Sequence, residues 1–330
     1  MKFKKKAIKG KIIGVVKKGI LFIALLFLLD FSIGRILRHY YFSQDSGLLY
    51  QTTYALDSTK ADIVIFGSSY ANHHYAPGPF ETRLHLSVYN AGRDGNYIFY
   101  HYAILKGLLK RYSPKKIILD FNFGAFEKDE ISYESMSSLL PYYRDHPELR
   151  SIIQLRGPFE KYKLASKVYP YNSLLFTIAV GNLDYNKTFR NKNNNEGFVP
   201  LFRTMNRQLS IDTLPKTYLM DTAKINIFKS FIRACEKSNV ALYIVVSPRY
   251  IKYTHQDLSI LTANKIADSM NVPFYNYLND PEILSNQENF ADLSHMNETG
   301  AKLFSNRVID QILQSKNADS SVAENTESKK

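Results

Sequence analysis

Tryptophan is absent from the 330-residue chain, and cysteine occurs only once, as Cys235. A single cysteine excludes an internal disulfide, and no cysteine–histidine spacing in the sequence resembles a structural zinc site. We therefore expect neither a metal nor a cofactor. Cys235 lies in a segment whose apolar residues recur at helical spacing, which predicts a place on the apolar face of a helix.

Acidic residues are scarce at the N-terminus, and this explains most of the formal net charge of +13. Residues 1–38 contain eight Lys and two Arg but a single acid, Asp30, which leaves 33 basic and 29 acidic residues in the rest of the chain. No run of Lys and Arg interleaved with aromatic residues occurs elsewhere. The charge therefore does not indicate a basic groove, and we expect no nucleic-acid partner.

A stretch without charges, residues 19–29, follows the basic N-terminus. It is shorter than the ~20 residues of a usual membrane span, but Lys17 and Lys18 can extend toward the headgroups, and apolar residues continue past Asp30. No small-x-small cleavage pattern follows. We expect a basic cytoplasmic tail at 1–11 and an uncleaved single-pass anchor at 12–37, with all residues after 40 outside the cytoplasm. The alternative is a basic amphipathic helix that lies on the membrane surface.

Strands and helices alternate along most of the remaining sequence, after a polar, aperiodic segment at 38–60 that we expect to be a stalk. Short β-branched runs bounded by turn residues predict strands, and apolar residues at 3.6-residue spacing predict helices. The expected strands are 62–67, 86–92, 115–123, 240–248 and 272–277, and the expected helices are 97–112, 222–239, 257–271 and 298–315. This alternation predicts an α/β fold, a parallel sheet in a three-layer α/β/α sandwich over residues 61–316.

Two segments do not follow this alternation. Residues 125–221 are rich in Tyr, Asn and Pro with weak periodicity, which is typical of a long insertion that forms a lid, a binding surface or a poorly ordered region. Its aromatic rings suit stacking on sugars, although an aromatic core is the more common explanation. Residues 317–330 have no apolar face, and we expect them to be disordered.

Polar residues that suit acyl-transfer chemistry follow the expected strands, where ligands bind in parallel sheets. Ser68 and Ser69 follow the first strand, Gly92 the second, and Asn122 the third. In "DLSH", Asp292 precedes His295 by three residues, so that the carboxylate can hold the imidazole ring. The set supplies a hydroxyl nucleophile, a base, an orienting acid and hydrogen-bond donors for an oxyanion.

The order of these residues resembles the four blocks of the SGNH (GDSL-like) hydrolase superfamily. The resemblance assigns Ser69 as nucleophile, His295 as base, Asp292 as its orienting acid, and Ser69, Gly92 and Asn122 as oxyanion donors. "FADLSHMNETGAKLFS" is the most specific match, whereas "GSSY" and "DFNF" depart from the usual Gly-Asp-Ser-Leu and Gly-x-Asn-Asp.

Alternatives remain at several of these positions. Ser69 can serve as a turn or cap residue, with Ser68 as the rival nucleophile. Gly92 can be required for its backbone conformation alone, and Asp120 is either an acid of the site or a strand-end cap. His73 and His74 lack an evident acid partner, and we interpret them as surface residues or as residues behind the site. Arg249 is interpreted as a solvated loop residue rather than a ligand for an anionic group.

The resemblance implies a serine esterase or O-acyltransferase in a bacterial cytoplasmic membrane, with its domain in the periplasm or at the cell surface. Anchored members of the superfamily act on cell-envelope polysaccharides in O-acetylation or teichoic-acid D-alanylation, often beside a multispanning membrane O-acyltransferase. Hydrolysis and transfer are not distinguished by sequence. The alternative is a non-catalytic carbohydrate-binding or scaffold module of an envelope acylation complex, which the altered blocks and the long insertion favour.

Overall fold

Five short apolar segments form one parallel sheet in the computed structural model, which describes residues 2–183 and 196–327. The sheet order is β2-β1-β3-β5-β7, and all five strands lie within the predicted segments. The strands are β1 (Ile63–Phe66), β2 (Val88–Asn90), β3 (Lys116–Asp120), β5 (Ala241–Val246) and β7 (Phe274–Asn276). In chain order this is the 2-1-3-4-5 arrangement of a doubly wound sheet.

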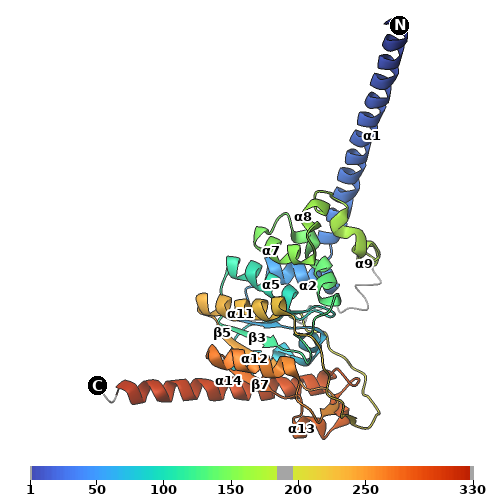
Figure 1. The fold of residues 1–330 in the computed structure, drawn as a ribbon. Helices are drawn as coiled ribbons and strands as arrows, with labels where there is room; N and C mark the ends of the chain where they lie inside the picture. Colours follow the sequence, from blue (N-terminus) through green and yellow to red (C-terminus); the bar gives the residue numbers. More distant parts are fainter. Residues whose placement is uncertain (1, 184–195, 328–330) are drawn as a thin grey trace.

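Helices cover both faces of this sheet (Figure 1), because alternate side chains of the buried strands point to opposite sides. Val64 and Phe66 of β1 belong to one apolar cluster, and Ile63 and Ile65 belong to the other. The first cluster is completed by α5 (Ile98–Arg111), α11 (Thr222–Lys237) and α12 (Leu258–Ser269), and the second by α3 (Ser69–His74), α4 (Pro77–Leu84), α13 (Pro281–Leu284) and α14 (Glu298–Glu327). The predicted α/β architecture with a parallel sheet is confirmed, and Cys235 lies on the apolar face of α11 with 1% exposure.

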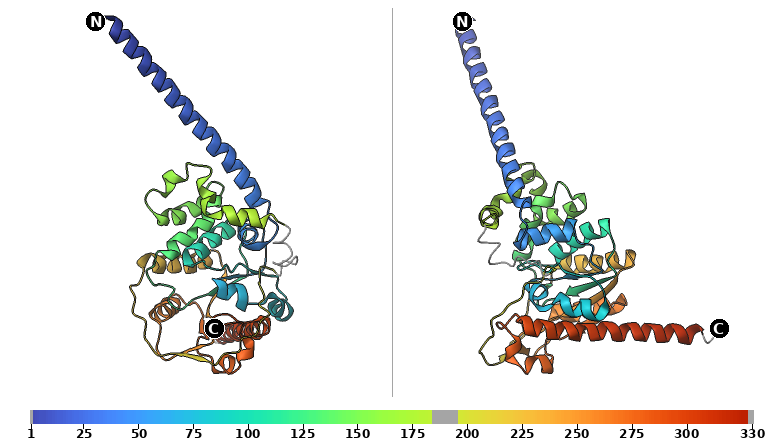
Figure 2. Two further views of the ribbon diagram at one scale, coloured as in Figure 1. Left: turned by 90° about the vertical axis from the view of Figure 1, so that its right-hand side faces the viewer. Right: turned by 180° about the vertical axis from the view of Figure 1, so that it is seen from behind.

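The N-terminus forms one 41-residue helix, α1 (Lys2–Phe42), which projects away from the domain (Figure 2). Gly10–Phe42 is long and apolar enough to cross a membrane, with a mean hydropathy of 2.5 in a window of which no part is buried. The same properties suit a signal sequence. The predicted span at 12–37 lies within this helix.

The predicted stalk at 38–60 is wrong, because the segment is mostly helical and packs on the domain. After the end of α1 comes α2 (Gly47–Asp57), which buries Leu49, Ala55 and Leu56. Its buried residues recur at helical spacing within a short segment that also contains many polar residues. Leu56 lies so close to α5 that a β-carbon on Gly107 would be 2.2 Å from its Cδ1 atom.

Residues 131–181 of the insertion at 125–221 form a layer of short helices beside α5 and the end of α1 nearest the domain. Several prolines interrupt it, which keeps each helix short. Its helices are α6 (Ile131–Glu134), η1 (Ser135–Tyr142), η2 (Pro147–Leu149), α7 (Arg150–Ile153), η3 (Gln154–Arg156), α8 (Glu160–Lys163), η4 (Tyr169–Leu174) and α9 (Leu175–Gly181). Buried Tyr142 and Tyr171 belong to the first apolar cluster, so these rings are core residues. Residues 184–195 of the insertion lie outside the described residues.

Two further features differ from the sequence expectation. A small parallel pair joins β4 (Ser210–Asp212) to β6 (Ile251–Tyr253), and a short helix, η5 (Gln287–Asn289), precedes the last helix. The tail predicted to be disordered continues α14 as far as Glu327, since neither Gly nor Pro occurs after Gly300 to end that helix. Residues 328–330 are outside the described part of the chain.

Candidate active site

The polar residues that follow β1, β2 and β3 meet at the carboxyl edge of the sheet. The strand order reverses at β1 and β3, which is where ligands bind in doubly wound folds. Ser69 is the first residue of α3, directly after β1, and Asn122 lies just after β3. His295 comes from the loop that precedes α14, and α14 packs against α3. The topology therefore brings residues separated by more than two hundred positions to one place.

Ser69, His295 and Asp292 form a continuous hydrogen-bonded row. The Nε2 atom of His295 lies 2.9 Å from the Oγ atom of Ser69, and its Nδ1 atom lies 3.0 Å from Oδ1 of Asp292. Oδ1 of Asp292 also accepts hydrogen bonds of 2.9 Å from the backbone N–H groups of Ser294 and His295. The Asp-x-x-His turn therefore fixes the carboxylate, and the carboxylate fixes the ring with Nε2 toward the serine. This arrangement suits proton removal from the hydroxyl.

The protonation states also suit this arrangement. Burial lowers the pKa of His295 and outweighs the charge of Asp292, which acts to raise it. Burial alone would raise the pKa of Asp292, but the Ser294 N–H, the charge of His295 and a hydrogen bond from Arg203 hold that pKa at about 2. At neutral pH the imidazole is therefore neutral and able to accept a proton, while the carboxylate is ionised.

The predicted oxyanion donors lie beside Ser69, but two of them have other partners. The Ser69 N–H begins α3, where the first N–H groups have no partner within the helix. The Gly92 N–H donates to Oδ1 of Asn90 at 2.9 Å, and Nδ2 of Asn122 donates to Oγ of Ser68 at 2.8 Å. Ser68, the rival nucleophile, is thus bonded to Asn122, whereas His295 is bonded to Ser69.

Gly92 is required by a close approach to α3. A β-carbon at this position would lie 2.5 Å from the backbone nitrogen of Asn72 and 2.8 Å from the carbonyl carbon of Ala71. No side chain fits without moving the helix that begins with Ser69. The glycine therefore lets the end of β2 pack tightly against the element that presents the serine.

His73 and His74 are buried behind His295, so the surface interpretation is wrong for both. The Nδ1 atom of His73 lies 2.7 Å from the Val199 carbonyl oxygen, and its Nε2 atom lies 3.6 Å from Oδ1 of Asp94. Its ring centroid is 5.2 Å from that of His295. Sequence analysis missed Asp94, although it follows the second strand closely enough to be found by the strand-end rule. A second acid–imidazole pair therefore adjoins the first.

Asp120 does not contact the Ser69–His295 pair directly. Its carboxylate accepts a 2.6 Å hydrogen bond from the Tyr75 hydroxyl and a second one from Ser247. Burial raises the pKa of Asp120 to about 7, although the hydrogen bonds from Ser247 and Tyr75 oppose this change. Asp120 also packs against Gly67, which has a φ of +153°. A β-carbon on Gly67 would lie 2.7 Å from Cβ of Asp120, so the two residues approach closely.

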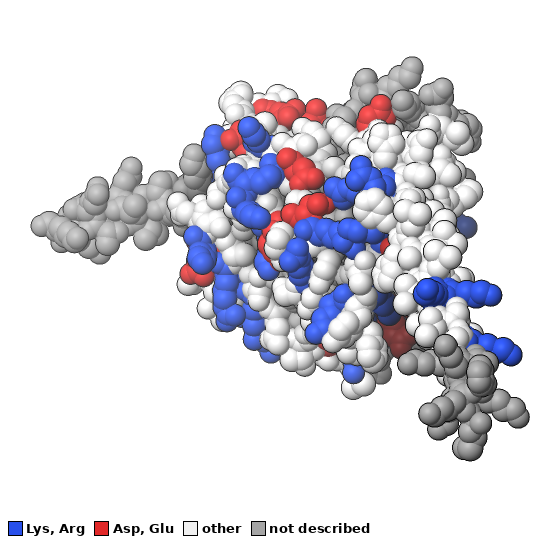
Figure 3. All heavy atoms as spheres, turned by 90° about the horizontal axis from the view of Figure 1, so that it is seen from above, with Lys and Arg blue, Asp and Glu red and all other residues white. Residues whose placement is uncertain are grey.

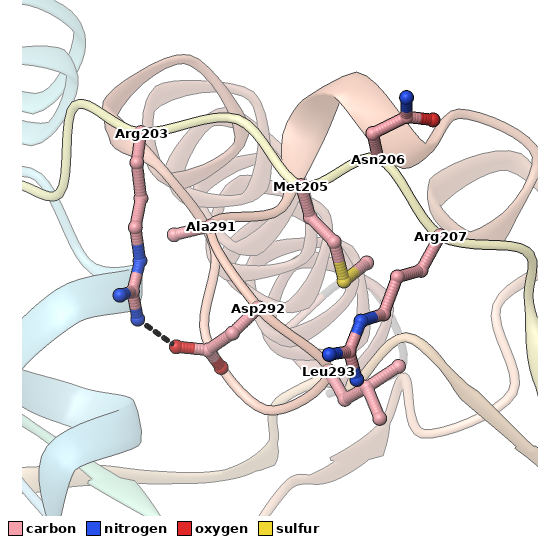
Figure 4. Close-up of a pocket in the computed structure, with 7 residues that line it drawn as sticks. All are labelled: Arg203, Met205, Asn206, Arg207, Ala291, Asp292 and Leu293. Carbon is pink, nitrogen blue, oxygen red and sulfur yellow. Dashed lines mark hydrogen bonds and ion pairs between the residues drawn. The ribbon is translucent and has the colours of Figure 1, made fainter.

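An open pocket of about 450 Å³ lies beside Asp292 (Figure 4). Nη2 of Arg203 donates a 2.6 Å hydrogen bond to Oδ2 of Asp292, and Arg207 lies on the other side of the hollow. Met205 and Leu293 supply apolar lining. Two guanidinium groups next to a candidate catalytic row favour an anionic or oxygen-rich ligand.

Arg249 is half-buried rather than a solvated loop residue. Its guanidinium carbon lies 5.6 Å from the ring centroid of Tyr70, and the Tyr70 ring stacks on His295 at 5.5 Å between centroids. Among the described residues, no group of three or more His, Cys, Asp or Glu side chains is arranged to hold a metal ion.

No protein-family model matches the chain, and no curated protein matches its sequence. The candidate chemistry therefore rests on the geometry of these residues and on the sequence resemblance.

Proposed function

We propose that this protein is a membrane-anchored serine esterase or O-acyltransferase of the SGNH type. The observation that carries the proposal is the 2.9 Å contact between Ser69 Oγ and His295 Nε2, with Asp292 on the other ring nitrogen. Nucleophile, base and orienting acid come from distant parts of the sequence, and they meet in the order that acyl transfer requires. Independent structural roles for the three residues do not explain this alignment.

In the proposed reaction, His295 Nε2 takes the proton of Ser69 as Oγ attacks the acyl carbonyl carbon. The N–H of Ser69 at the start of α3 stabilises the oxyanion, together with the second N–H of the Asn122 amide, whose first N–H is held by Ser68. The Gly92 N–H joins them when Asn90 releases it. His295 then protonates the leaving alcohol, which leaves an acyl group on Ser69. Water or a sugar hydroxyl, deprotonated by His295, attacks the acyl-serine and restores the enzyme.

The proposed setting is the outer face of a bacterial cytoplasmic membrane. Helix α1 serves as the single-pass anchor, with its lysine-rich end in the cytoplasm. The proposed substrate is an acyl ester, acetyl above all, of an extracytoplasmic cell-envelope polysaccharide. Arg203 and Arg207 beside the site support an anionic or oxygen-rich polymer. A multispanning membrane O-acyltransferase is the proposed partner that delivers the acyl group.

A fluorophosphonate probe tests the proposal directly, because it labels only an activated serine. We expect the full-length protein in detergent to be labelled, Ser69→Ala to lose all labelling, and Ser68→Ala to keep it. Labelling that survives in Ser69→Ala contradicts the assignment of the nucleophile. No labelling of the unaltered protein, with the fold intact by circular dichroism, refutes the enzyme and favours the non-catalytic binding module.

A further inference from the structure

Contacts of Asp30 fix the level at which α1 leaves the apolar part of the membrane. Its carboxylate accepts hydrogen bonds from the backbone N–H groups of Lys167 at 2.7 Å and Val168 at 3.2 Å, and from the Ser166 hydroxyl. A β-carbon on Gly34 would lie 2.3 Å from Cβ of Lys167, so the helix and this segment are in close contact. A carboxylate and the non-helical backbone that binds it are both costly in lipid-exposed hydrocarbon. Residues 166–168 therefore lie at the boundary of the membrane.

The uncharged part of α1 is short, and this keeps the domain close to the lipid. The uncharged run at 19–29 covers about 16 Å of helix, against a hydrocarbon thickness of about 30 Å. Lys17 and Lys18 must extend toward the headgroups at the other end to complete the span. The whole apolar stretch before Asp30 is needed to cross the hydrocarbon, so Asp30 itself lies at the level of the headgroups.

Helix α8 and the residue before it expose aromatic and basic side chains near this boundary. Phe159 is 67% exposed and Tyr162 is 64% exposed, and they precede the segment that binds Asp30 by seven and four residues. Lys161 and Lys163 are also exposed, and Nζ of Lys163 lies 3.7 Å from Oε2 of the buried Glu160. Figure 1 shows α8 next to α1 at the end of the domain from which α1 emerges. Seen from that end, the molecule carries many Lys and Arg side chains (Figure 3).

We propose that the segment 159–163 docks on the anionic headgroups of the membrane that α1 spans. Phe159 and Tyr162 enter the headgroup region, where aromatic side chains are enriched, and Lys161 and Lys163 pair with lipid phosphates. Together with α1, this second contact prevents rotation about a single helix and fixes how the domain faces the bilayer. The inference rests on the membrane anchoring in the proposed function and not on its catalytic chemistry.

The absence of tryptophan provides a direct test. Phe159→Trp gives the full-length protein a single tryptophan as reporter. The variant is reconstituted into phosphatidylcholine–phosphatidylglycerol vesicles whose acyl chains carry bromine, a contact quencher, close to the headgroups. Phe27→Trp in α1 is the positive control, and Phe202→Trp beside the candidate site is the control for an exposed aromatic residue, since Phe202 is 74% exposed. We expect quenching of the tryptophans at 27 and 159 but not at 202.

Substitution of Lys161 and Lys163 by Ala in the Phe159→Trp protein measures how much their charges contribute to docking. We expect the docked fraction to fall by about fivefold per lysine in anionic vesicles and to change little in neutral ones. Quenching at 159 no stronger than at 202 refutes lipid docking and leaves a protein partner as the occupant of this face. A lack of quenching at 27 shows instead that the anchor itself is wrong, so the two failures are distinct.

Discussion

His73 offers a quantitative test of the electrostatics behind His295. Although burial opposes a charge on His73, hydrogen bonds to Asp94 and to the Val199 carbonyl raise its pKa above the ordinary value of 6.5. The pKa of His295 is lowered instead. Burial is the main cause, and the neighbouring charge of His73 lowers this pKa further. Where His295 titrates, His73 is therefore already protonated. Replacement of His73 by Asn removes a positive charge and must raise the pKa of His295.

The size of this shift follows from the distance between the rings. Two unit charges at the 5.2 Å centroid separation repel by about 0.8 kcal/mol at a dielectric constant of 80 and by about 3 kcal/mol at 20. One pKa unit corresponds to 1.36 kcal/mol, so the bare repulsion is worth roughly 0.6 to 2.3 units. The Asp94 carboxylate cancels part of it. We expect His73→Asn to raise the pKa of His295 by about half to one unit.

The rate of fluorophosphonate labelling of Ser69, measured against pH, reports this pKa as the midpoint of its acid limb. In His73→Asn that midpoint should move to higher pH by about half to one unit. His146→Asn is a matched control, because His146 also pairs with acids, Asp57 and Glu148, but lies in the insertion away from the site. A midpoint that stays in place or moves to lower pH in His73→Asn refutes the reasoning.

Three further variants test other parts of the site. Asp292→Asn should reduce the labelling rate of Ser69 by about 10⁴-fold, because the ring loses the acceptor that fixes its tautomer; a loss below tenfold contradicts this. Gly92→Ala should reduce that rate by about 100-fold, because its β-carbon would meet the backbone nitrogen of Asn72 at 2.5 Å and displace Ser69 by a fraction of an ångström or more; an unchanged rate shows that α3 can yield. Asp120→Asn should change the pH dependence of stability. The folded pKa of about 7 lies above the ordinary 3.8, so the native state binds the extra proton and stability falls as pH rises through this window. In the unaltered protein, the free energy of unfolding measured in urea should fall by up to about 4 kcal/mol between pH 4 and 8, and in Asp120→Asn this fall should disappear. The same dependence of that free energy on pH in both proteins contradicts the prediction.

The central sheet was predictable because its strands are fully buried. Segments such as 62–67 and 240–248 are continuous β-branched or apolar runs between turn residues, and helices of ordinary length separate them. Alternation of this kind permits few topologies, since parallel strands need crossover connections. The polarity of a parallel sheet then places Ser69, Gly92 and Asn122 at one edge without any knowledge of side-chain contacts.

Elements that depend on a partner were not predictable in the same way. Helix α2 has a narrow apolar stripe, Leu49 with Ala55 and Leu56, whose helical conformation is stabilised by packing on α5. In the isolated sequence the polar residues around that stripe resemble a stalk. The contacts of Asp30 with residues 166–168 are also tertiary. An acid at the end of an apolar run indicates only that the run ends there.

In the candidate site, too, local geometry was predictable from the sequence and tertiary contacts were not. Asp292 and His295 are three residues apart, so a single turn sets their geometry, and the local sequence is sufficient to predict the pair. The directions of the donor groups depend on side chains from other strands, and they differ from expectation. Nδ2 of Asn122 points to Ser68. Ser68, the first serine of "GSSY", thus holds the Asn122 amide next to Ser69, which is bonded to His295. Ser68 stands where the GDSL pattern has an aspartate. Ser68 therefore places a neutral hydroxyl beside Ser69 and keeps Asn122 in place, which is compatible with the nucleophilic role proposed for Ser69.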